Sequence, residues 1–528
     1  MSESISANKP ETHRELDPAE DRATLETPHR ALLMVAVMGV SIIQFLDATI
    51  ANVALPHMQA SLGASMDTVA WVLTSYIIAT VLVTPAVGWV SDRLGSRQVF
   101  LWAVAGFLLT SMLCGAATSL AQMVFFRTLQ GFCAAFIGPM SQTIMYDINP
   151  PSKQPAAISM WGMVVMIAPI TGPMLGGLIT DTLNWRWIFY INLPLGIPTL
   201  LILAWLLPSR PRVIRGLDRL GFLALATALV CVQLMLDRGQ SKDWFTSTEI
   251  LVELLIAGAA FWVFFVHTFT TRSPLFSAGL LRNRNFLAAF MFMFVLGAAN
   301  IAIASIQPIM FQNVYGYSAW DTGLLLMPRG IGVMIMMTFV SRIMHRVDIR
   351  YLTCVGLLIA SYALWMMSQW ALDMGRGPIL LAGFVQGLGL GLTFTPMNVA
   401  AFTTLKPEYR PDAASLLNLM RSIGGSFGIS IMVTYISRTT QVSHADMASA
   451  VTSYNLPGID PATMALRFGE IGPAFLGLLN MEMSRQALMI AYLDNFYAMA
   501  MLVFAVALSV LLFKPIRLRG GTAGGRGQ

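Results

Sequence analysis

Charged side chains are scarce in this chain of 528 residues, where Asp, Glu, Lys and Arg together make up 11%. Soluble domains hold about 25%. Hydrophobic residues make up 56%, and the mean hydropathy is +0.66. The scarcity of charge excludes a large soluble domain and indicates a protein embedded in a lipid bilayer.

Cysteine is also scarce. All four cysteines fall inside apolar stretches, which favours packing residues over a disulfide framework or a metal site: Cys114, Cys133, Cys231 and Cys354. The chain has no GxxxxGK[ST] loop, so ATP is not implied, and we expect no cofactor. Residues 1–29 hold no apolar run, so we expect no cleavable signal peptide.

Long apolar runs are abundant instead. A membrane-crossing helix needs about 20 residues, and the sequence holds fourteen runs of suitable length. We expect spans at about 31–55, 68–90, 98–117, 121–145, 157–180, 187–207, 220–236, 249–268, 286–311, 320–340, 350–369, 378–403, 412–436 and 488–513. Backbone in lipid must satisfy its own hydrogen bonds, so the chain is predicted to be an all-α polytopic membrane protein.

Lys and Arg are unevenly distributed between the two sides of the predicted membrane. With the amino terminus inside, 23 of the 33 fall in inward loops and tails, seven in outward loops and three in spans. Basic residues accumulate on the cytoplasmic side, so both termini are predicted to be cytoplasmic. The pI of 9.2 then follows from topology, and no nucleic-acid partner is needed to explain it.

A weak internal repeat has an offset of 256 residues. Gln130 matches Gln386, and the loop proline Pro151 matches Pro407. Chance similarity between two apolar helices is the alternative. A duplication predicts two six-helix bundles with a binding cavity between them. The predicted domains are a disordered tail (1–30), an N-terminal bundle (31–207), a linker with two extra spans (208–285), a C-terminal bundle (286–513) and a tail (514–528).

The first span contains one carboxylate, Asp47. An ionisable group at membrane depth costs on the order of 3 kcal/mol, so it is a candidate for function. At 1.5 Å per residue, Asp47 and Arg127 of the fourth span both lie roughly 10 Å below the outer surface. We therefore expect the two to pair, with a protonation state of Asp47 that responds to small changes in distance or hydration. That behaviour suits proton coupling; a static ion pair is the alternative.

Four sequence blocks carry a family resemblance. They are LDATIANVALP (46–56), GWVSDRLGSR (88–97), FRTLQG (126–131), and APITGPMLGG (168–177) followed by NWRWIFYINLP (184–194). The chain resembles the fourteen-span drug:proton antiporters of the major facilitator superfamily, and within them the EmrB-type multidrug exporters. The resemblance implies the major facilitator fold and a location in a bacterial inner membrane. It also implies a membrane-fusion adaptor and an outer-membrane channel as partners.

The block after the second span is predicted to form a conformational latch. Gly88 and Gly95 permit close backbone approach, while Asp92, Arg93 and Arg97 lie at the cytoplasmic boundary, where they can pair across the halves or with helix ends. For Arg93 and Arg97, simple anchoring of the topology is the alternative.

Glycine and proline in the fifth span predict a hinge. We expect the helix to be interrupted or bent at Pro169, Gly172, Pro173, Gly176 and Gly177. Close packing of a neighbouring helix is the alternative explanation for these residues.

Three further charges fall inside predicted spans. Arg329 and Arg421 lie near mid-membrane, and Asp494 lies near the outer third of the last span. Pairing of Asp494 with either arginine would give the second half its own network, which could share the titration with Asp47. Hydration of Asp494 at the interface is the alternative. The resemblance implies that an acid at position 494 and Arg421 are common in EmrB-type proteins, and Arg329 less so.

Sparse amides are the remaining polar groups expected in the cavity: Gln44, Asn52, Gln130, Asn300, Gln307, Gln386, Asn398 and Asn418. With 35 Met and 30 Phe in the chain, such a cavity favours hydrophobic or amphipathic substrates over sugars.

Residues 437–487 are predicted to form one long outward loop. The resemblance makes this loop a candidate docking surface for the adaptor; an exposed linker with no partner is the alternative. The function expected is drug efflux by proton antiport. Export of a dedicated metabolite or fatty acid, import of small polar nutrients, and a sensor that transports nothing remain open.

Overall fold

The computed structural model describes residues 22–212, 216–271, 274–276, 280, 283–344, 347–403, 405–450 and 471–510. Within these ranges the regular structure is helical, and fourteen helical segments are long and apolar enough to cross a membrane. The predicted tail at 514–528 and most of the tail at 1–30 lie outside the described residues. The prediction of an all-α protein with fourteen spans is confirmed.

Six spans form the first bundle. They are α1 (Arg30–Leu62), α3 (Trp71–Val83) continued by α4 (Val87–Leu94), α5 (Ser96–Ala116), α6 (Leu120–Asp147), α7 (Gln154–Thr182), and α8 (Trp187–Tyr190) continued by α9 (Asn192–Leu206). A short helix, α2 (Met66–Val69), precedes α3. We call this bundle the N-half.

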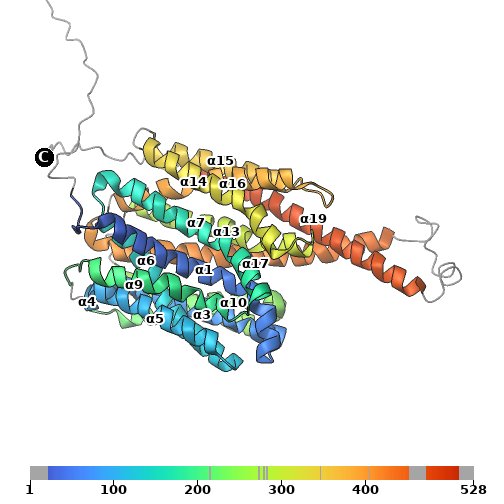
Figure 1. Cartoon of the computed structure of the whole chain (residues 1–528), viewed down its shortest axis with the longest axis horizontal. Helices are drawn as coiled ribbons and strands as arrows, with labels where there is room; N and C mark the ends of the chain where they lie inside the picture. The colour runs from blue at the N-terminus through green and yellow to red at the C-terminus, as the bar shows by residue number, and fades with distance from the viewer. Residues whose placement is uncertain are drawn as a thin grey trace, which may run out of the picture.

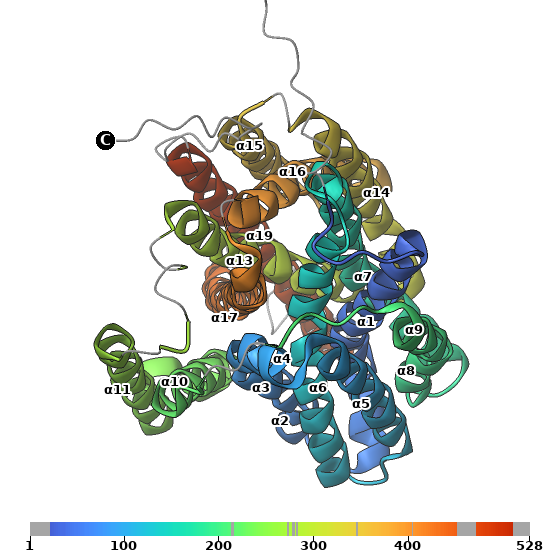
Figure 2. The ribbon, with the colours of Figure 1, turned by 90° about the vertical axis from the view of Figure 1, so that its left-hand side faces the viewer.

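Six more spans form the second bundle, the C-half. They are α13 (Arg284–Asn313), α14 (Ala319–Ile343), α15 (Ile349–Met367), α16 (Arg376–Thr403), α17 (Arg410–Ala450) and α19 (Ile471–Val510). The two extra helices, α10 (Arg219–Arg238) and α11 (Thr248–Thr270), pack against each other outside the two bundles, with α10 next to α3 (Figure 2).

Polar side chains fix several helix starts. The side-chain oxygens of Ser119, Asn283 and Ser318 accept hydrogen bonds from backbone N–H groups in the first turns of α6, α13 and α14. At the end of α1, Gly63 takes a left-handed conformation with φ 62°. Capping satisfies backbone groups that have no partner inside the helix, so short polar loops are sufficient between the spans.

The helices run along the long axis of the molecule (Figure 1). We call the end that holds the start of α1, the end of α6 and the start of α17 the base, and the opposite end the far end. The halves contact each other through α7 against α14 and α16, and through α4 and α6 against α17. At the far end, α17 and α19 extend well beyond the other helices (Figure 1).

Four segments differ from their predicted structure. Residues 437–450 and 471–487, expected to be loop, continue α17 and α19 as helix, because hydropathy detects only the apolar part of a helix that continues into water. Residues 451–470 lie outside the described residues. The second span is broken by a 3₁₀ turn at Thr84–Ala86 around Pro85, while α7 is one continuous helix through Pro169 and Pro173, where an interruption was expected.

Candidate functional site

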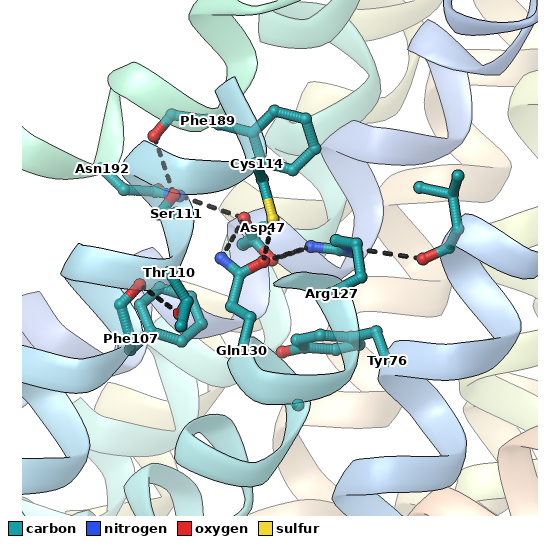
Figure 3. A network of polar contacts seen from close by, with 12 residues as sticks. Asp47, Tyr76, Phe107, Thr110, Ser111, Cys114, Arg127, Gln130, Phe189 and Asn192 are labelled. Carbon is teal, nitrogen blue, oxygen red and sulfur yellow. Dashed lines mark hydrogen bonds and ion pairs between the residues drawn. The ribbon is translucent and has the colours of Figure 1, made fainter. Parts of the chain in front are cut away.

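Asp47 of α1 and Arg127 of α6 form a buried ion pair. Arg127 Nη1 lies 2.7 Å from Asp47 Oδ2, and both side chains are 0% exposed. Figure 3 shows the pair at the centre of a polar network inside the N-half. The predicted pairing is confirmed. It could be predicted because α1 and α6 run in opposite directions and bring the two residues to the same depth.

Two amides complete the shell around the carboxylate. Gln130 Nε2 of α6 and Asn192 Nδ2 of α9 both donate to Asp47 Oδ1, at 3.2 and 3.0 Å. Asp47 therefore accepts hydrogen bonds from three side chains on two other helices. All three partner atoms are donors, which matches an ionised carboxylate.

Arg127 has an incomplete set of partners. Its Nη1 also donates to Gln130 Oε1 at 2.8 Å, and its Nε donates to the carbonyl of Val72 on α3 at 3.2 Å. The guanidinium carbon lies 4.3 Å from the centre of the Tyr76 ring. The remaining nitrogen, Nη2, is buried with no hydrogen-bond partner. Because Nη2 is an unused donor, the Arg127 guanidinium could donate to another acceptor if the charge of Asp47 were removed.

A second layer of polar groups extends the network to α5 and α8. Asn192 Nδ2 donates to Ser111 Oγ at 2.9 Å, and Ser111 Oγ donates to the carbonyl of Phe189 at 2.9 Å (Figure 3). Cys114 Sγ lies 3.7 Å from Gln130 Oε1, so this cysteine contacts the site and is not only a packing residue. Ser111, Asn192 and Tyr76 were not predicted, since an uncharged polar residue in an apolar span gives no signal of the direction it faces.

The chemistry available to this network is proton binding. Protonation would remove the charge of Asp47 and turn one acceptor oxygen into a donor that faces only donors. The contacts to Arg127, Gln130 and Asn192 would then have to rearrange, which would shift α1 relative to α6 and α9.

A chain of buried amides crosses between the halves. Gln142 of α6 donates from Nε2 to Asn398 Oδ1 of α16 at 2.8 Å, and Asn418 of α17 donates from Nδ2 to Gln142 Oε1 at 2.9 Å. The chain ends at Arg421, whose Nη2 donates to Asn418 Oδ1 at 3.0 Å. Two predicted cavity residues, Asn398 and Asn418, thus join the halves directly.

An ionic cluster closes the base. Asp147, at the end of α6, lies 2.7 Å from Arg210 Nε and 3.1 Å from Arg410 Nη1 at the start of α17. The backbone carbonyl of Asp147 also accepts from the N–H of Leu25, at 2.9 Å. Asp147 and Arg210 line a cavity of about 20 Å³, together with Pro411 and other residues. The cluster ties the N-half, the segment after α9 and the C-half together, and the sequence had not indicated it.

The predicted latch residues divide into two groups. A Cβ on Gly88 would collide with the carboxylate of Asp412 at the start of α17, so Gly88 allows close contact between the halves. Gly95 has φ 99° and lies next to Arg212. By contrast, Arg97 donates from Nη2 to the carbonyl of Ala204 at the end of α9, at 2.6 Å, which lies within the N-half.

Arg93, another predicted latch residue, contacts a residue of its own helix. The Arg93 guanidinium lies 5.3 Å from the centre of the Trp89 ring and is exposed. Asp92 is partly buried and has a partner. Gly88 thus contacts the C-half, whereas Arg97 binds the end of α9 within the N-half.

The glycines of α7 form close helix contacts. A Cβ on Gly172 would collide with Thr49 of α1, one on Gly176 would lie 3.0 Å from Ile50, and one on Gly177 would collide with Ala319 of α14. Since α7 is continuous, these glycines bring α1 and α14 against it, with Pro169 and Pro173 inside the helix. The packing explanation is supported by these contacts, and the hinge role stays a prediction.

The predicted pairing of Asp494 is wrong. Its side chain is exposed on α19 and makes no ion pair with a described residue. Arg329 instead donates from Nη2 to Asn300 Oδ1 of α13, and Arg421 contacts Asn418 and the Phe45 ring, 5.1 Å away. Depth alone had suggested the pairing, but depth does not fix which side of a helix a residue occupies.

The other predicted cavity amides have different surroundings. Gln307 is buried and donates to Met367 Sδ of α15 at 3.2 Å, inside the C-half. Gln44 Oε1 and Gln386 Oε1 are buried without a hydrogen-bond partner. Asn52 is exposed on α1 and takes no part in the Asp47 network. Asn300 connects the halves, since its Nδ2 lies 3.1 Å from Met166 Sδ of α7.

The model of the Major Facilitator Superfamily matches residues 37–429, about three quarters of the chain. The chain belongs to the major facilitator superfamily. Its arrangement of two bundles is the arrangement of superfamily transporters, and the additional α10 and α11 bring the number of spans to fourteen.

Relatives within the superfamily match nearly the whole chain. The Multidrug export protein EmrB of Escherichia coli strain K12 is 31% identical over 510 residues, which is 96% of this chain and 99% of that protein. The Fatty acid resistance protein FarB of Neisseria gonorrhoeae is 31% identical over 484 residues, 90% of this chain and 95% of that protein. The resemblance to EmrB-type exporters is confirmed.

Solved transporter structures share the fold. The human organic anion transporter MFSD10 superposes with a TM-score of 0.57 at 14% identity, covering 90% of this chain and all of that one. A bacterial homologue of the human lysosomal transporter Spinster gives a TM-score of 0.52 at 18% identity, covering 92% of this chain and 98% of that one. The protein is a multi-pass membrane transporter of the major facilitator fold.

Proposed function

We propose that this transporter exports hydrophobic or amphipathic drugs and toxicants in exchange for protons. The name of the EmrB relative, which describes multidrug export, supports the substrate class. One observation carries the proposal of proton exchange: the fully buried Asp47 carboxylate is contacted only by donor groups of Arg127, Gln130 and Asn192. A protonated Asp47 would itself be a donor, so these contacts would have to change.

The proposed mechanism is alternating access. A proton that reaches Asp47 from the outer side releases Arg127 and permits return to the inward-facing state; loss of the proton to the cytoplasm restores the pair and prepares the site for substrate. Each proton moved down the field gains about 2.3 kcal/mol per 100 mV. No cofactor is required, because the gradient supplies the energy.

The proposed setting is a bacterial inner membrane with both termini in the cytoplasm, which makes the base the cytoplasmic end. The excess of Lys and Arg in the inward loops supports this orientation. A carboxyl-terminal fusion tests it: green fluorescent protein should fluoresce there and alkaline phosphatase should be inactive. The reverse result would invert the topology.

The proposed partners are a membrane-fusion adaptor and an outer-membrane channel. The far-end extension formed by α17 and α19 projects beyond the bundles and supports this proposal as a docking surface (Figure 1). Shortening both helices at that end should reduce resistance in cells that contain the adaptor while transport in proteoliposomes is kept. Equal loss in both assays would count against docking.

The central test uses an efflux-deficient host and purified protein in proteoliposomes with an imposed pH gradient. The wild type should confer resistance to several chemically distinct hydrophobic toxicants and should export them only when the gradient is present. Asp47→Asn should lose gradient-driven export, whereas Asp494→Asn, an exposed carboxylate in a span, should keep it. Full gradient-driven export by Asp47→Asn would refute the role of Asp47.

Export of a dedicated metabolite or a fatty acid is the second candidate. The name of the FarB relative, a fatty acid resistance protein, favours it. Resistance restricted to long-chain fatty acids in the same host would select this candidate over multidrug export.

A further inference from the structure

The C-half holds two buried guanidiniums without a carboxylate. Arg329 of α14 is 2% exposed and Arg421 of α17 is 8% exposed. Among the residues that the structure describes, neither forms an ion pair. Arg329 is the more extreme case, because its Nε and Nη1 are buried with no hydrogen-bond partner at all. A buried charge without a counter-charge is strongly unfavourable, so the site has an unmet demand for an anion.

The internal repeat shows which residue of the N-half corresponds to Arg329. In the N-half, a Cβ on Gly131 would collide with the backbone oxygen of Tyr76; in the C-half, one on Gly387 would collide with the backbone oxygen of Arg329. Gly387 is the counterpart of Gly131, 256 positions further along the chain. Each glycine packs against the backbone of one residue, so Arg329 in the C-half corresponds to Tyr76 in the N-half.

The same register identifies the counterpart of Asp47. Asn300 precedes Arg329 by 29 positions, as Asp47 precedes Tyr76. The C-half thus has an arginine that contacts an amide where the N-half has a carboxylate. Asn300 supplies Arg329 with an acceptor and no negative charge.

Both guanidiniums lie on the side of the C-half that faces the N-half. Arg421 lies against the Phe45 ring of α1, and Asn300, the partner of Arg329, contacts Met166 of α7. The two arginines also share α13, because a Cβ on Gly297, one turn before Asn300, would collide with the backbone of Arg421. Both arginines therefore lie at the interface between the halves, next to apolar and thioether side chains.

We propose that Arg329 and Arg421 form an anion-recognition site for the acidic head group of an amphipathic substrate, whose apolar part lies against Phe45 and Met166. This inference rests on the proposed export of amphipathic compounds and narrows their class to organic anions. Asn300 and Asn418, the amides that Arg329 and Arg421 contact, would orient the head group beside the two charges.

The test measures binding to the full-length protein in lipid nanodiscs with three probes of equal chain length: decanesulfonate, decanol and decyltrimethylammonium. The sulfonate stays charged at every working pH, which separates head-group recognition from proton coupling. The wild type should bind decanesulfonate at least about tenfold more tightly than decanol. Arg329→Gln and Arg421→Gln should remove that preference, while Arg376→Gln, an exposed arginine paired with Asp321, should keep it. Equal affinity of the wild type for the three probes would overturn the proposal, as would complete displacement of decanesulfonate by equimolar chloride.

A gain of stability provides an independent test that does not depend on the glutamine variants folding. Asn300→Asp should place a carboxylate against Arg329 as Asp47 lies against Arg127. The variant should melt at a higher temperature than the wild type and lose decanesulfonate binding. Unchanged binding with a lower melting temperature would overturn the proposal. If the wild type exports drugs but shows no anion preference, only this inference fails; if it binds decanesulfonate but confers no resistance, the proposed export function fails.

Discussion

Gln142 donates a hydrogen bond to Asn398, its own counterpart in the duplicated sequence, 256 positions further along the chain. The next turn repeats the relationship, since the rings of Tyr146 and Phe402, separated by the same offset, stack at 4.3 Å. Residues related by a two-fold axis can touch only where they lie close to it. The axis between the halves therefore passes between α6 and α16 near the base.

Removal of Arg127 is predicted to destabilise the fold more than removal of the pair. Arg127→Gln leaves a buried carboxylate uncompensated, which typically costs about 3 to 5 kcal/mol. The double variant Asp47→Asn with Arg127→Gln should recover part of that loss, because neither charge remains. Thermal unfolding in detergent would measure both. Additive effects of the two single changes would show that the pair is not coupled.

Loss of the charge of Asp147 is predicted to open the base. In Asp147→Asn, Arg210 and Arg410 would lie beside each other without their shared counter-charge. Labelling of Ser91→Cys, which lines the same cavity, by a polar maleimide should then accelerate in a background without native cysteines. Asp321→Asn, which changes an exposed pair at the far end, is the control. An unchanged labelling rate would show that the cluster does not close the base.

A methyl group on Gly88 is predicted to separate the halves at the base. The Cβ of Gly88→Ala would overlap the Asp412 carboxylate, so the closed arrangement seen here should become less populated. Spin labels on α4 and α17 should report a longer distance. Gly258→Ala, on α11 with open space around the added carbon, should leave that distance unchanged. Identical distances for both variants would contradict the prediction.

Gly172→Ala is predicted to lower the stability of the protein rather than to change the transition between the inward-facing and outward-facing states. Its Cβ would collide with Thr49 of α1, two residues from Asp47, and overpacking of this kind typically costs about 1 to 3 kcal/mol. The melting temperature should fall, and Thr49→Ala should restore part of it in the double variant. A fall of the same size in Gly258→Ala would point to a general effect of the added methyl group.

The fold and one part of the site could be predicted from the sequence. Apolar runs indicate spans directly, and the depth of Asp47 and Arg127 follows from counting along helices of known direction. The depth of a residue does not tell which side of its helix it occupies. The expected pairing of Asp494 with Arg329 or Arg421 therefore fails, since the Asp494 side chain is exposed.

Other contacts depend on details that the sequence does not display. Asn192 and Ser111 are ordinary polar residues until α9 and α5 bring them to Asp47. Asp147 falls just outside the predicted span at 121–145, where a carboxylate is ordinary and gives no signal, although the structure places it buried in the last turn of α6. The glycines of α7 suggested an interruption, yet the helix continues, because glycine and proline in lipid are tolerated when neighbouring helices pack closely.

The extra helix α10 is attached to both halves at the far end. Asp237 accepts from Thr74 of α3, while the carbonyl of Leu236 accepts from Ser430 of α17, at 2.7 Å; in the turn that follows, Trp244 donates to Thr434 at 3.0 Å. A helix that is hydrogen-bonded to both halves cannot move with both when they move apart. If the halves part there during transport, α10 must release one of them, so these hydrogen bonds oppose opening at the far end. At about 1 kcal/mol for each hydrogen bond, that resistance would slow opening at this end several-fold or more.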